Sequence, residues 1–522
     1  MNRVQQAYDR IRQVNRPEVW IDLRPQQDVA ADFAEANGPL AGKLVAVKGN
    51  IDVAGLPTTA GCPAYAYEPT NDAPVVAQLK AMGAVILGTT NMDQFATGLV
   101  GTRSPYGAVR NAIDPKRISG GSSSGSAVAV ALGIADLALG TDTAGSGRVP
   151  AAFNGIVGLK PTKGLLSTEG VVPACKSLDC VSIFARTVAE AEFALTCLTD
   201  QSPARSKPYR LGVPEKLDDL APGWAEAFEA AVRTFGAELV PVDLEPFLQA
   251  ARLLYDGAFV AERYTAVGEF IDSHQAEVDP TVATIISGAK NIPAHRLFAD
   301  HDKLEELARK ADAQLSEVDA IVLPTTTEHP TIEDVEADPI GVNARLGRFT
   351  NSTNLLGLAA LAIPAGTVNG LPFGISLMGK AFTDMTLTAI AKSAPNTKKI
   401  AVVGAHLAGQ PLNTQLLERG GKLVETTKTA PTYRLFALDT TPPKPGLVRV
   451  ENGEAIETEV WELPVAGFGD FVASLSTPMA IGKVELADGT WVPGFTCERY
   501  ALEKATDITE YGGWRAYLAR PR

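Results

Sequence analysis

The sequence has few of the residues that bind metals or form disulfides. It contains five cysteines and five histidines in 522 residues, and neither type occurs in the CxxC or HExxH spacings typical of zinc sites. An odd number of cysteines fits reduced thiols better than a disulfide framework, so we expect a cytoplasmic protein. We expect no metal and no other cofactor.

Long hydrophobic runs and excess positive charge are also lacking. No run of about 18 apolar residues occurs, and the N-terminal segment has no apolar core of the signal-peptide kind, so neither a membrane span nor secretion is predicted. A net charge of −13 disfavours nucleic-acid and anionic membrane partners. What is present is an ordinary globular composition, 45% hydrophobic and 20% charged, in a chain long enough for two or more domains.

Short apolar segments alternate with amphipathic ones along most of the chain. A strand at 44–48, a helix at 75–82 and a strand at 84–89 begin a pattern typical of an α/β fold. Residues 245–316 are helical in pattern, and we expect them to cover one edge of the sheet. Further strands are expected at 135–140, 156–159, 320–323, 361–363 and 373–378.

The character of the sequence changes at the polar segment SAPNTKK. We therefore expect a first domain over residues 1–393, a linker at 394–399 and a second domain over 400–522. In the second domain, short β-like runs alternate with Gly, Pro and Asp turns, which predicts a small, barrel-like α+β domain.

Two glycine-serine clusters lie in the middle of the first domain, GGSSSGS at 120–126 and GTDTAGSGRVP at 140–150. A P-loop is rejected because the Lys-Ser/Thr pair that should follow its second glycine is missing. The first cluster formally fits a GxSxG nucleophile elbow, but a charged, proline-containing segment precedes it where a buried strand is required. A flexible linker remains the alternative for that cluster taken alone.

Together with Lys48 and the GLKPT motif at 158–162, the two clusters resemble the amidase signature family. The resemblance covers roughly residues 40–380 and depends on several motifs in the same order and spacing. It implies a mixed β-sheet core covered by helices. It also implies that Ser146 is the nucleophile, Ser122 a bridging serine and Lys48 the base.

A Ser–Ser–Lys relay is chemically reasonable for amide hydrolysis. A serine hydroxyl needs a base within hydrogen-bond reach, and a lysine can be that base if burial keeps it neutral. The bridging serine would then return the proton to the leaving nitrogen. Small residues in the second cluster would let backbone N–H groups converge as an oxyanion hole. The expected donors are Thr143, Ala144, Gly145 and Ser146.

The remaining polar residues of the clusters have structural interpretations. We interpret Asp142 and Arg148 as an ion pair that holds the nucleophile loop. Ser123, Ser124 and Ser126 are expected in turns and helix caps. Neither group is assigned to the chemistry.

Two residues of the predicted helical cap are candidates for substrate binding. Tyr255 and Arg263 are eight residues apart, and we expect them on roughly the same face of one helix. Arginine can bind a carboxylate with two parallel hydrogen bonds, and a tyrosine can donate beside it. The alternative is a core tyrosine and a surface arginine.

The last 120 or so residues are similar to the domain appended to allophanate hydrolases. The similar runs include GAHLAGQPLNTQL, ETTKTAPTYRLFAL and DITEYGGWRAYLA, so the resemblance extends over essentially the whole chain. It implies that Tyr255 and Arg263 hold the substrate. It also implies hydrolysis of allophanate to ammonia and N-carboxycarbamate, which breaks down to ammonia and carbon dioxide. For that second step it suggests His406; a structural histidine in a dimerisation domain is the alternative.

The expected partners follow from this reaction. We expect a small-molecule substrate, a homodimer and a functional link to an enzyme that makes allophanate, in nitrogen catabolism from urea or cyanuric acid. One alternative is an amidase with another substrate, including the amidase component of a tRNA-dependent amidotransferase, which should lack the C-terminal domain. The other is a non-catalytic scaffold on the same fold, against which the intact Lys48, Ser122 and Ser146 argue.

Overall fold

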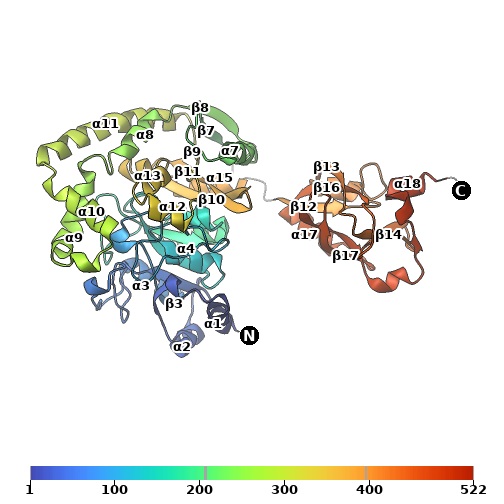
Figure 1. Cartoon of the computed structure of the whole chain (residues 1–522), viewed down its shortest axis with the longest axis horizontal. Helices are drawn as coiled ribbons and strands as arrows, with labels where there is room; N and C mark the ends of the chain where they lie inside the picture. Colours follow the sequence, from blue (N-terminus) through green and yellow to red (C-terminus); the bar gives the residue numbers. More distant parts are fainter. Residues whose placement is uncertain (1, 205–207, 394–396, 521–522) are drawn as a thin grey trace. The chain divides into compact units, whose positions relative to one another are not determined.

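The computed structural model describes residues 2–204, 208–393 and 397–520. The chain divides into two compact units, residues 1–394 and 395–522 (Figure 1). Of the linker expected at 394–399, residues 394–396 lie outside the described residues, and residues 397–399 begin strand β12 (Thr397–Val402). Within the described ranges, no helix combines the length and the apolar character needed to cross a membrane.

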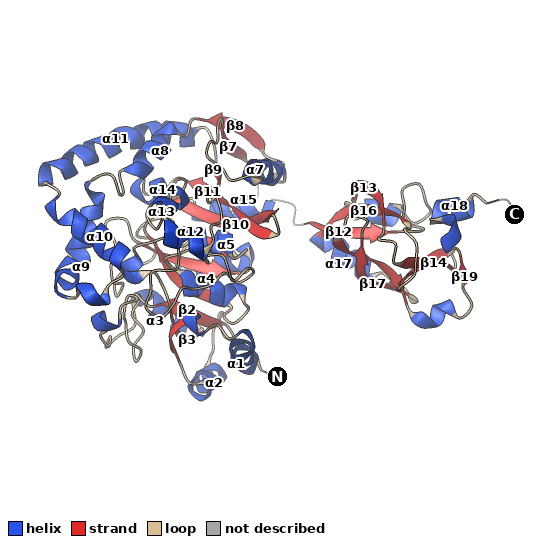
Figure 2. Cartoon of the chain, viewed as in Figure 1, coloured by secondary structure: helices blue, strands red, loops and turns tan. Residues whose placement is uncertain are grey.

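A mixed sheet of 11 strands runs through the first unit, with helices on both sides (Figure 2). Strand β2 is parallel to β3 and β4, and β7 is parallel to β8 and β9, whereas the other neighbours are antiparallel. This confirms the predicted mixed sheet covered by helices. In spatial order the strands are β1 (Trp20–Leu23), β3 (Val85–Thr90), β2 (Leu44–Lys48), β4 (Leu137–Asp142), β6 (Cys180–Ala185), β5 (Val157–Lys160), β10 (Ala359–Val368), β11 (Leu371–Gly379), β9 (Ala320–Pro324), β7 (Arg210–Pro214) and β8 (Glu238–Val242).

The central strands are buried on both faces, which explains their nearly continuous apolar sequences. Val45 and Val47 of β2 pack into one hydrophobic core, and Leu44 and Ala46 pack into the other. The first core also contains residues of α3 (Pro74–Ala81), α6 (Val188–Leu198), α7 (Trp224–Arg233) and α15 (Asp384–Ser393). The second contains residues of α1 (Arg3–Val14), α2 (Gln26–Glu35), α4 (Ser124–Ala131) and α5 (Val149–Phe153).

A group of helices follows β8 and lies together on one side of this unit (Figure 1). It comprises α8 (Glu245–Arg252), α9 (Ala261–Ser273), α10 (Pro280–Gly288) and α11 (Ala294–Ser316). The single helix expected to carry Tyr255 and Arg263 is broken: Tyr255 lies in the turn after α8, and Arg263 lies in α9. Gly257 in this turn approaches the backbone so closely that a Cβ would lie 2.5 Å from Leu253 O.

Three short helices connect β9 to β10. They are α12 (Ile332–Ala337), α13 (Gly341–Leu346) and α14 (Asn351–Leu355). All five residues of α14 are buried although four of them are polar. Such a helix must satisfy its polar side chains by contacts inside the protein.

The second unit is built on a sheet of five strands and a sheet of three. The larger sheet has β13 (Lys422–Lys428) and β17 (Met479–Glu485) at its ends, with β16 (Glu457–Pro464), β12 and β18 (Trp491–Cys497) between them. A bridge between Thr429 and Leu486 joins the two end strands, so the sheet curls towards a barrel. The smaller sheet contains β14 (Tyr433–Leu438), β15 (Lys444–Arg449) and β19 (Thr506–Asp507), and the helices are α16 (Thr414–Leu417), α17 (Val465–Ala473) and α18 (Trp514–Leu518).

Candidate active site

Two neighbouring parallel strands bring Lys48 next to the first glycine-serine cluster. Lys48 ends β2, and β4 beside it ends in Thr141 and Asp142. Lys48 Nζ lies 2.8 Å from Ser122 Oγ and 2.6 Å from Thr141 Oγ1. The carboxyl ends of parallel strands are where α/β sheets commonly place their ligand sites, so this pair lies at a favourable position for chemistry.

The environment of Lys48 favours its neutral form. The residue is 0% exposed, and burial lowers its pKa to about 7 against the opposing effect of nearby carboxylates, chiefly Asp93. Near pH 7 a large fraction of the amine is therefore neutral. It can then accept a proton from the Ser122 hydroxyl, with which it shares a hydrogen bond.

Asp93, which sequence reasoning does not single out, supports the turn that carries Ser122. Its backbone N–H donates to Ser122 O at 3.2 Å, and a Cβ on Gly121 would lie 2.1 Å from Asp93 Oδ2. The peptide bond between Gly121 and Ser122 is cis. Burial raises the pKa of the Asp93 carboxyl, although it accepts three backbone N–H groups from the loop at 100–103. The sequence around Asp93 contains no motif that indicates this role, because the role depends on hydrogen bonds to backbone groups 7 to 10 residues further along.

The other serines of the first cluster hold neighbouring elements in place. Ser123 Oγ donates to Thr141 O at 3.0 Å, and Ser126 Oγ donates to Leu139 O at 2.9 Å. Both acceptors belong to β4. Ser123 precedes α4 but makes no capping hydrogen bond with its side chain. Their structural role is thus to attach α4 to β4 rather than to cap the helix.

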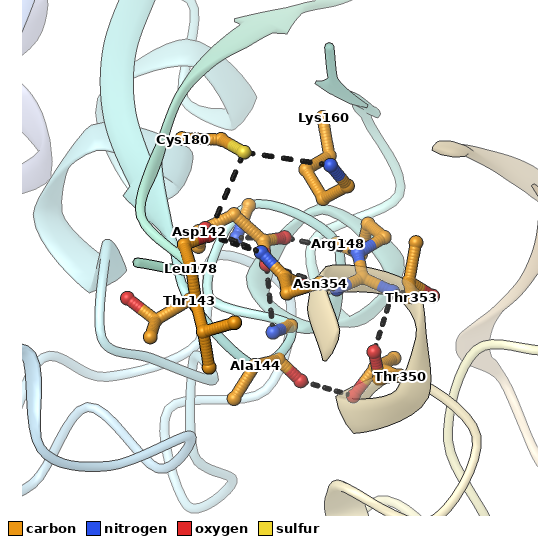
Figure 3. Close-up of polar contacts among 12 residues, drawn as sticks. Asp142, Thr143, Ala144, Arg148, Lys160, Leu178, Cys180, Thr350, Thr353 and Asn354 are labelled. Atoms are coloured by element: carbon orange, nitrogen blue, oxygen red, sulfur yellow. Dashed lines mark hydrogen bonds and ion pairs between the residues drawn. The ribbon is translucent and has the colours of Figure 1, made fainter. Parts of the chain in front are cut away.

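The Asp142 carboxylate holds the loop that carries Ser146. Its two oxygens accept the N–H groups of Gly145 at 2.8 Å and Gly147 at 3.0 Å. Arg148 binds the same two oxygens through Nη2 and Nε, each at 2.9 Å (Figure 3). Burial alone would raise the pKa of Asp142, but Arg148 holds it below its ordinary value. The pair therefore stays ionised and fixes the loop.

One of the four expected oxyanion-hole donors is already in use. The Gly145 N–H donates to Asp142 Oδ1, so Gly145 is not available to a substrate oxyanion, and the expectation for it needs correction. The N–H groups of Thr143, Ala144 and Ser146 have no partner among the described residues. All three residues are buried, each 2% exposed, and unpaired N–H donors are what an oxyanion hole requires.

Ser146 is 2% exposed and lies in this loop between the two glycines that Asp142 binds. No hydrogen bond joins it to Ser122 in the described part of the chain. The structure thus contains the Lys48–Ser122 link of the expected relay, whereas the link from Ser122 to Ser146 is not formed.

Tyr255 and Arg263 meet even though their helix is broken. Arg263 Nη2 lies 3.3 Å from Tyr255 OH, and Arg263 Nη1 lies 2.9 Å from Thr97 Oγ1. Arg263 is 1% exposed and its Nε has no hydrogen-bond partner. No carboxylate of the described residues forms a direct ion pair with this guanidinium, although, against the lowering effect of burial, the buried Asp179 is near enough to raise its pKa. The arrangement suits an anionic ligand.

A cavity of about 490 Å³ opens beside Tyr255. Lys48 and Ser146 are not part of its walls. It approaches the nucleophile loop at Asn351, whose amide nitrogen, turned towards the loop, donates to Ala144 O at 2.9 Å. The walls consist of Asp219, Leu248, Ala251, Arg252, Tyr255, Asp256, Thr327, Ala344, Arg345, Arg348 and Asn351.

His406 lies in the second unit, in a closed environment. Its Nε2 is 3.0 Å from Gln415 Oε1, its ring stacks on Phe495 at 4.8 Å, and it is 6% exposed. Burial lowers its pKa. The cavity that it borders together with Lys444 measures only about 10 Å³. As for metals, no group of three or more His, Cys, Asp or Glu among the described residues is arranged to hold one.

Comparison with known families and structures identifies relatives of both units. Residues 4–388 match the family Amidase, and residues 398–519 match the family Allophanate hydrolase C-terminal domain. Urea amidolyase of Saccharomyces cerevisiae is 46% identical over 96% of the chain, which corresponds to 31% of that protein. The chain thus spans about a third of the length of this relative.

Two further relatives differ in how much of the chain they match. The structure of Kluyveromyces lactis allophanate hydrolase is 39% identical, covers 99% of this chain and 96% of its own, and superposes with a TM-score of 0.69. The 2-amino-5-chloromuconic acid deaminase of Comamonas testosteroni is 33% identical but covers only 72% of this chain and 87% of its own. The chain therefore belongs to the amidase family and carries an allophanate hydrolase C-terminal domain.

Proposed function

We propose that the chain hydrolyses allophanate, H2N–CO–NH–COO⁻, with Ser146 as nucleophile, Ser122 as bridging serine and Lys48 as base. The observation that carries the proposal is the 2.8 Å hydrogen bond between Lys48 and Ser122, made by a buried amine whose pKa is about 7. The names of the relatives, urea amidolyase and allophanate hydrolase, support this choice of substrate.

In the first half of the reaction, Ser146 Oγ attacks the carbamoyl carbon. Its proton passes to Ser122 Oγ while the Ser122 proton passes to Lys48 Nζ. This transfer requires a small rearrangement that brings Ser146 to Ser122. The N–H groups of Thr143, Ala144 and Ser146 stabilise the oxyanion. The proton then returns through Ser122 to the leaving nitrogen, and ammonia departs.

In the second half, water attacks the acyl-enzyme with the same base. The C–O bond to Ser146 breaks, and the proton taken from water restores the serine hydroxyl. The product is N-carboxycarbamate. Protonation of this product gives one ammonia and two molecules of carbon dioxide, which balances its atoms.

Arg263 and Tyr255 are proposed to bind the substrate carboxylate. The buried guanidinium has an unused Nε, and no carboxylate among the described residues forms a direct ion pair with it; Asp179 acts on it only from further away. A carboxylate there would complete a charge-assisted pair. Urea, which has no carboxylate, is expected to be a poor substrate for this reason.

The second unit is proposed to act on N-carboxycarbamate, with His406 as the candidate residue. Support comes from the neighbouring Lys444, whose cation would attract a dianion, and from the lowered pKa of the ring, which keeps it neutral at pH 7. Because the cavity there is only about 10 Å³, the unit must open to admit this ligand. We also propose a cytoplasmic homodimer that receives allophanate from a partner enzyme.

The test is ammonia release from allophanate, malonamate, urea and simple aliphatic amides, with Ser146→Ala as the control. We expect allophanate to be the best substrate and Ser146→Ala to be inactive. If simple amides are turned over well and allophanate is not, the assignment of allophanate as the substrate is wrong. Activity in Ser146→Ala would refute the mechanism.

A further inference from the structure

Helix α14, with the residue before it, contacts both the nucleophile loop and the Asp142–Arg148 pair that holds this loop. Thr350 Oγ1 donates to Ala144 O at 2.6 Å, and Thr350 is 0% exposed. Gly145 has a φ of +139°, and a Cβ on it would lie 2.4 Å from Thr350 Oγ1. Position 145 therefore needs glycine both for its backbone conformation and for the close approach of Thr350.

These contacts fix one peptide plane at both of its ends. The Ala144 carbonyl and the Gly145 N–H belong to the same rigid peptide unit. The carbonyl accepts from Thr350 and from the Asn351 amide, and the N–H donates to Asp142 Oδ1 at 2.8 Å. Rotation of this unit would break all three bonds. The unit is flanked by the peptides that carry the free N–H groups of Ala144 and Ser146, so its orientation determines where those groups point.

The same helix is tied to the ion pair beneath the loop. Arg148 Nη1 donates to Thr350 O at 3.0 Å, and Asn354 Nδ2 donates to Asp142 O at 2.7 Å. Figure 3 shows Arg148 between Asp142 on one side and Thr350 and Thr353 on the other. The backbone of Thr350 is thus held by the same arginine that binds Asp142 under the loop.

We propose that Thr350 is a positioning residue for the oxyanion hole. Its hydroxyl does not touch the substrate; it orients the Ala144–Gly145 peptide so that the neighbouring N–H groups converge on the developing oxyanion. Preorganised donors of this kind act mainly in the transition state, so loss of the hydroxyl should reduce kcat and leave KM nearly unchanged. The inference rests on the proposed function only in taking Ser146 as the nucleophile.

The test compares Thr350→Val, which keeps the shape and removes the hydroxyl, with Thr350→Ser, which keeps the hydroxyl. On the best substrate of the panel, we expect Thr350→Val to lower kcat on the order of 10- to 100-fold with KM within about twofold. Thr350→Ser should recover kcat to within about threefold. The pH dependence of kcat/KM should stay as in the wild type because Lys48 is untouched.

Thr388→Val is the matched control. Thr388 is also a 0% exposed threonine, and its hydroxyl donates to Glu192 Oε1 at 2.7 Å, away from the loop. We expect this variant to lose thermal stability while keeping kcat. If Thr350→Val is too unstable to assay, Thr350→Ala gives the same comparison against Thr350→Ser.

Two outcomes overturn the inference, and they differ from failure of the proposed function. A wild-type kcat in Thr350→Val, or an unrecovered kcat in Thr350→Ser, shows that the hydroxyl does not position the oxyanion hole, even if Ser146→Ala is inactive. Activity in Ser146→Ala overturns the mechanism and this inference together. A different preferred substrate changes only the substrate assignment, because any amide forms an oxyanion.

Discussion

At the scale of single residues, the proposed active site depends on keeping Lys48 neutral. Burial lowers the Lys48 pKa to about 7, although Asp93 and two further carboxylates oppose the shift. The amine keeps hydrogen bonds to Ser122 and Thr141. Its lowered pKa leaves a large fraction of the amine unprotonated at pH 7, and its hydrogen bonds position it to accept a proton.

This environment predicts an acidic limit to activity. We expect kcat/KM to fall about tenfold per pH unit below roughly pH 7, because the protonated amine cannot act as a base. Lys48→Arg, which stays charged throughout, should lose activity by at least about 1,000-fold and recover none of it up to pH 9. Initial rates between pH 5 and 9 measure both effects, and a flat wild-type profile between pH 6 and 8 would remove Lys48 from the role of base.

The same pKa shift predicts how stability changes with pH. The folded pKa of about 7 lies below the ordinary value of 10.5, so between these values unfolding takes up one proton at Lys48. Stability should therefore rise with pH in this window, by about 1.4 kcal/mol per unit from this residue. Lys48→Met should lack this contribution, and urea unfolding at pH 7.5 to 9.5 measures the two slopes. Equal slopes in the two proteins would contradict a lowered pKa.

At the scale of elements, a break between two helices places the proposed carboxylate clamp. Tyr255 lies in the turn after α8 and Arg263 lies in α9, yet their side chains are 3.3 Å apart. In one regular helix, eight residues would separate the two positions by about 12 Å along the axis. The turn at Gly257 instead directs Arg263 inwards, where it is 1% exposed.

Replacement of this arginine tests the clamp. Arg263→Lys should raise KM for allophanate on the order of 10- to 100-fold with a smaller effect on kcat, because a point charge replaces a planar fork. Malonamate, which carries a similar carboxylate, should show the same increase, and a neutral amide should show none. Steady-state kinetics on the three compounds is sufficient; an unchanged KM for the two anions would exclude Arg263 from the site.

The elements that sequence alone predicts are those with strong local patterns. The predicted strand at Leu44–Lys48 has the same bounds as the observed one, because a continuous apolar run ends there at a charged residue and a glycine. Helix α14, with the sequence NSTNL, escapes prediction because asparagine, serine and threonine are poor helix formers. It forms because Arg148 and Asp142 bind its polar side chains, and no local pattern reports partners that distant in sequence.

The residues of the candidate site likewise fall into two groups, those that the sequence predicts and those that it does not. Lys48 and Ser122 are predicted together from motifs, and they share a hydrogen bond. Asp93 and Thr350 are not predicted, because their roles depend on hydrogen bonds to backbone groups whose direction the sequence does not give. The hydrogen bond from the Gly145 N–H to Asp142 also cannot be predicted, because the sequence does not give the direction of a peptide plane.

At the scale of the whole molecule, the two compact units have separate hydrophobic cores. Every residue discussed for the first ammonia release lies in residues 1–394. We therefore expect a protein ending at residue 393 to fold and to release the first ammonia from allophanate at close to the full-length rate. Ammonia counted per allophanate consumed, with full-length His406→Ala as the comparison, would separate the two steps. Loss of folding in the truncated protein would indicate a structural role for the second unit.

The neutral amine of Lys48 also bears on the products of the proposed reaction. An uncharged amine is the form of lysine that combines with dissolved carbon dioxide to give a carbamate, which is no longer a base. Lys48 avoids open contact with solvent by being 0% exposed, with the hydroxyls of Ser122 and Thr141 against its nitrogen. In the proposed reaction, this burial would protect the catalytic amine from the carbon dioxide that the reaction releases.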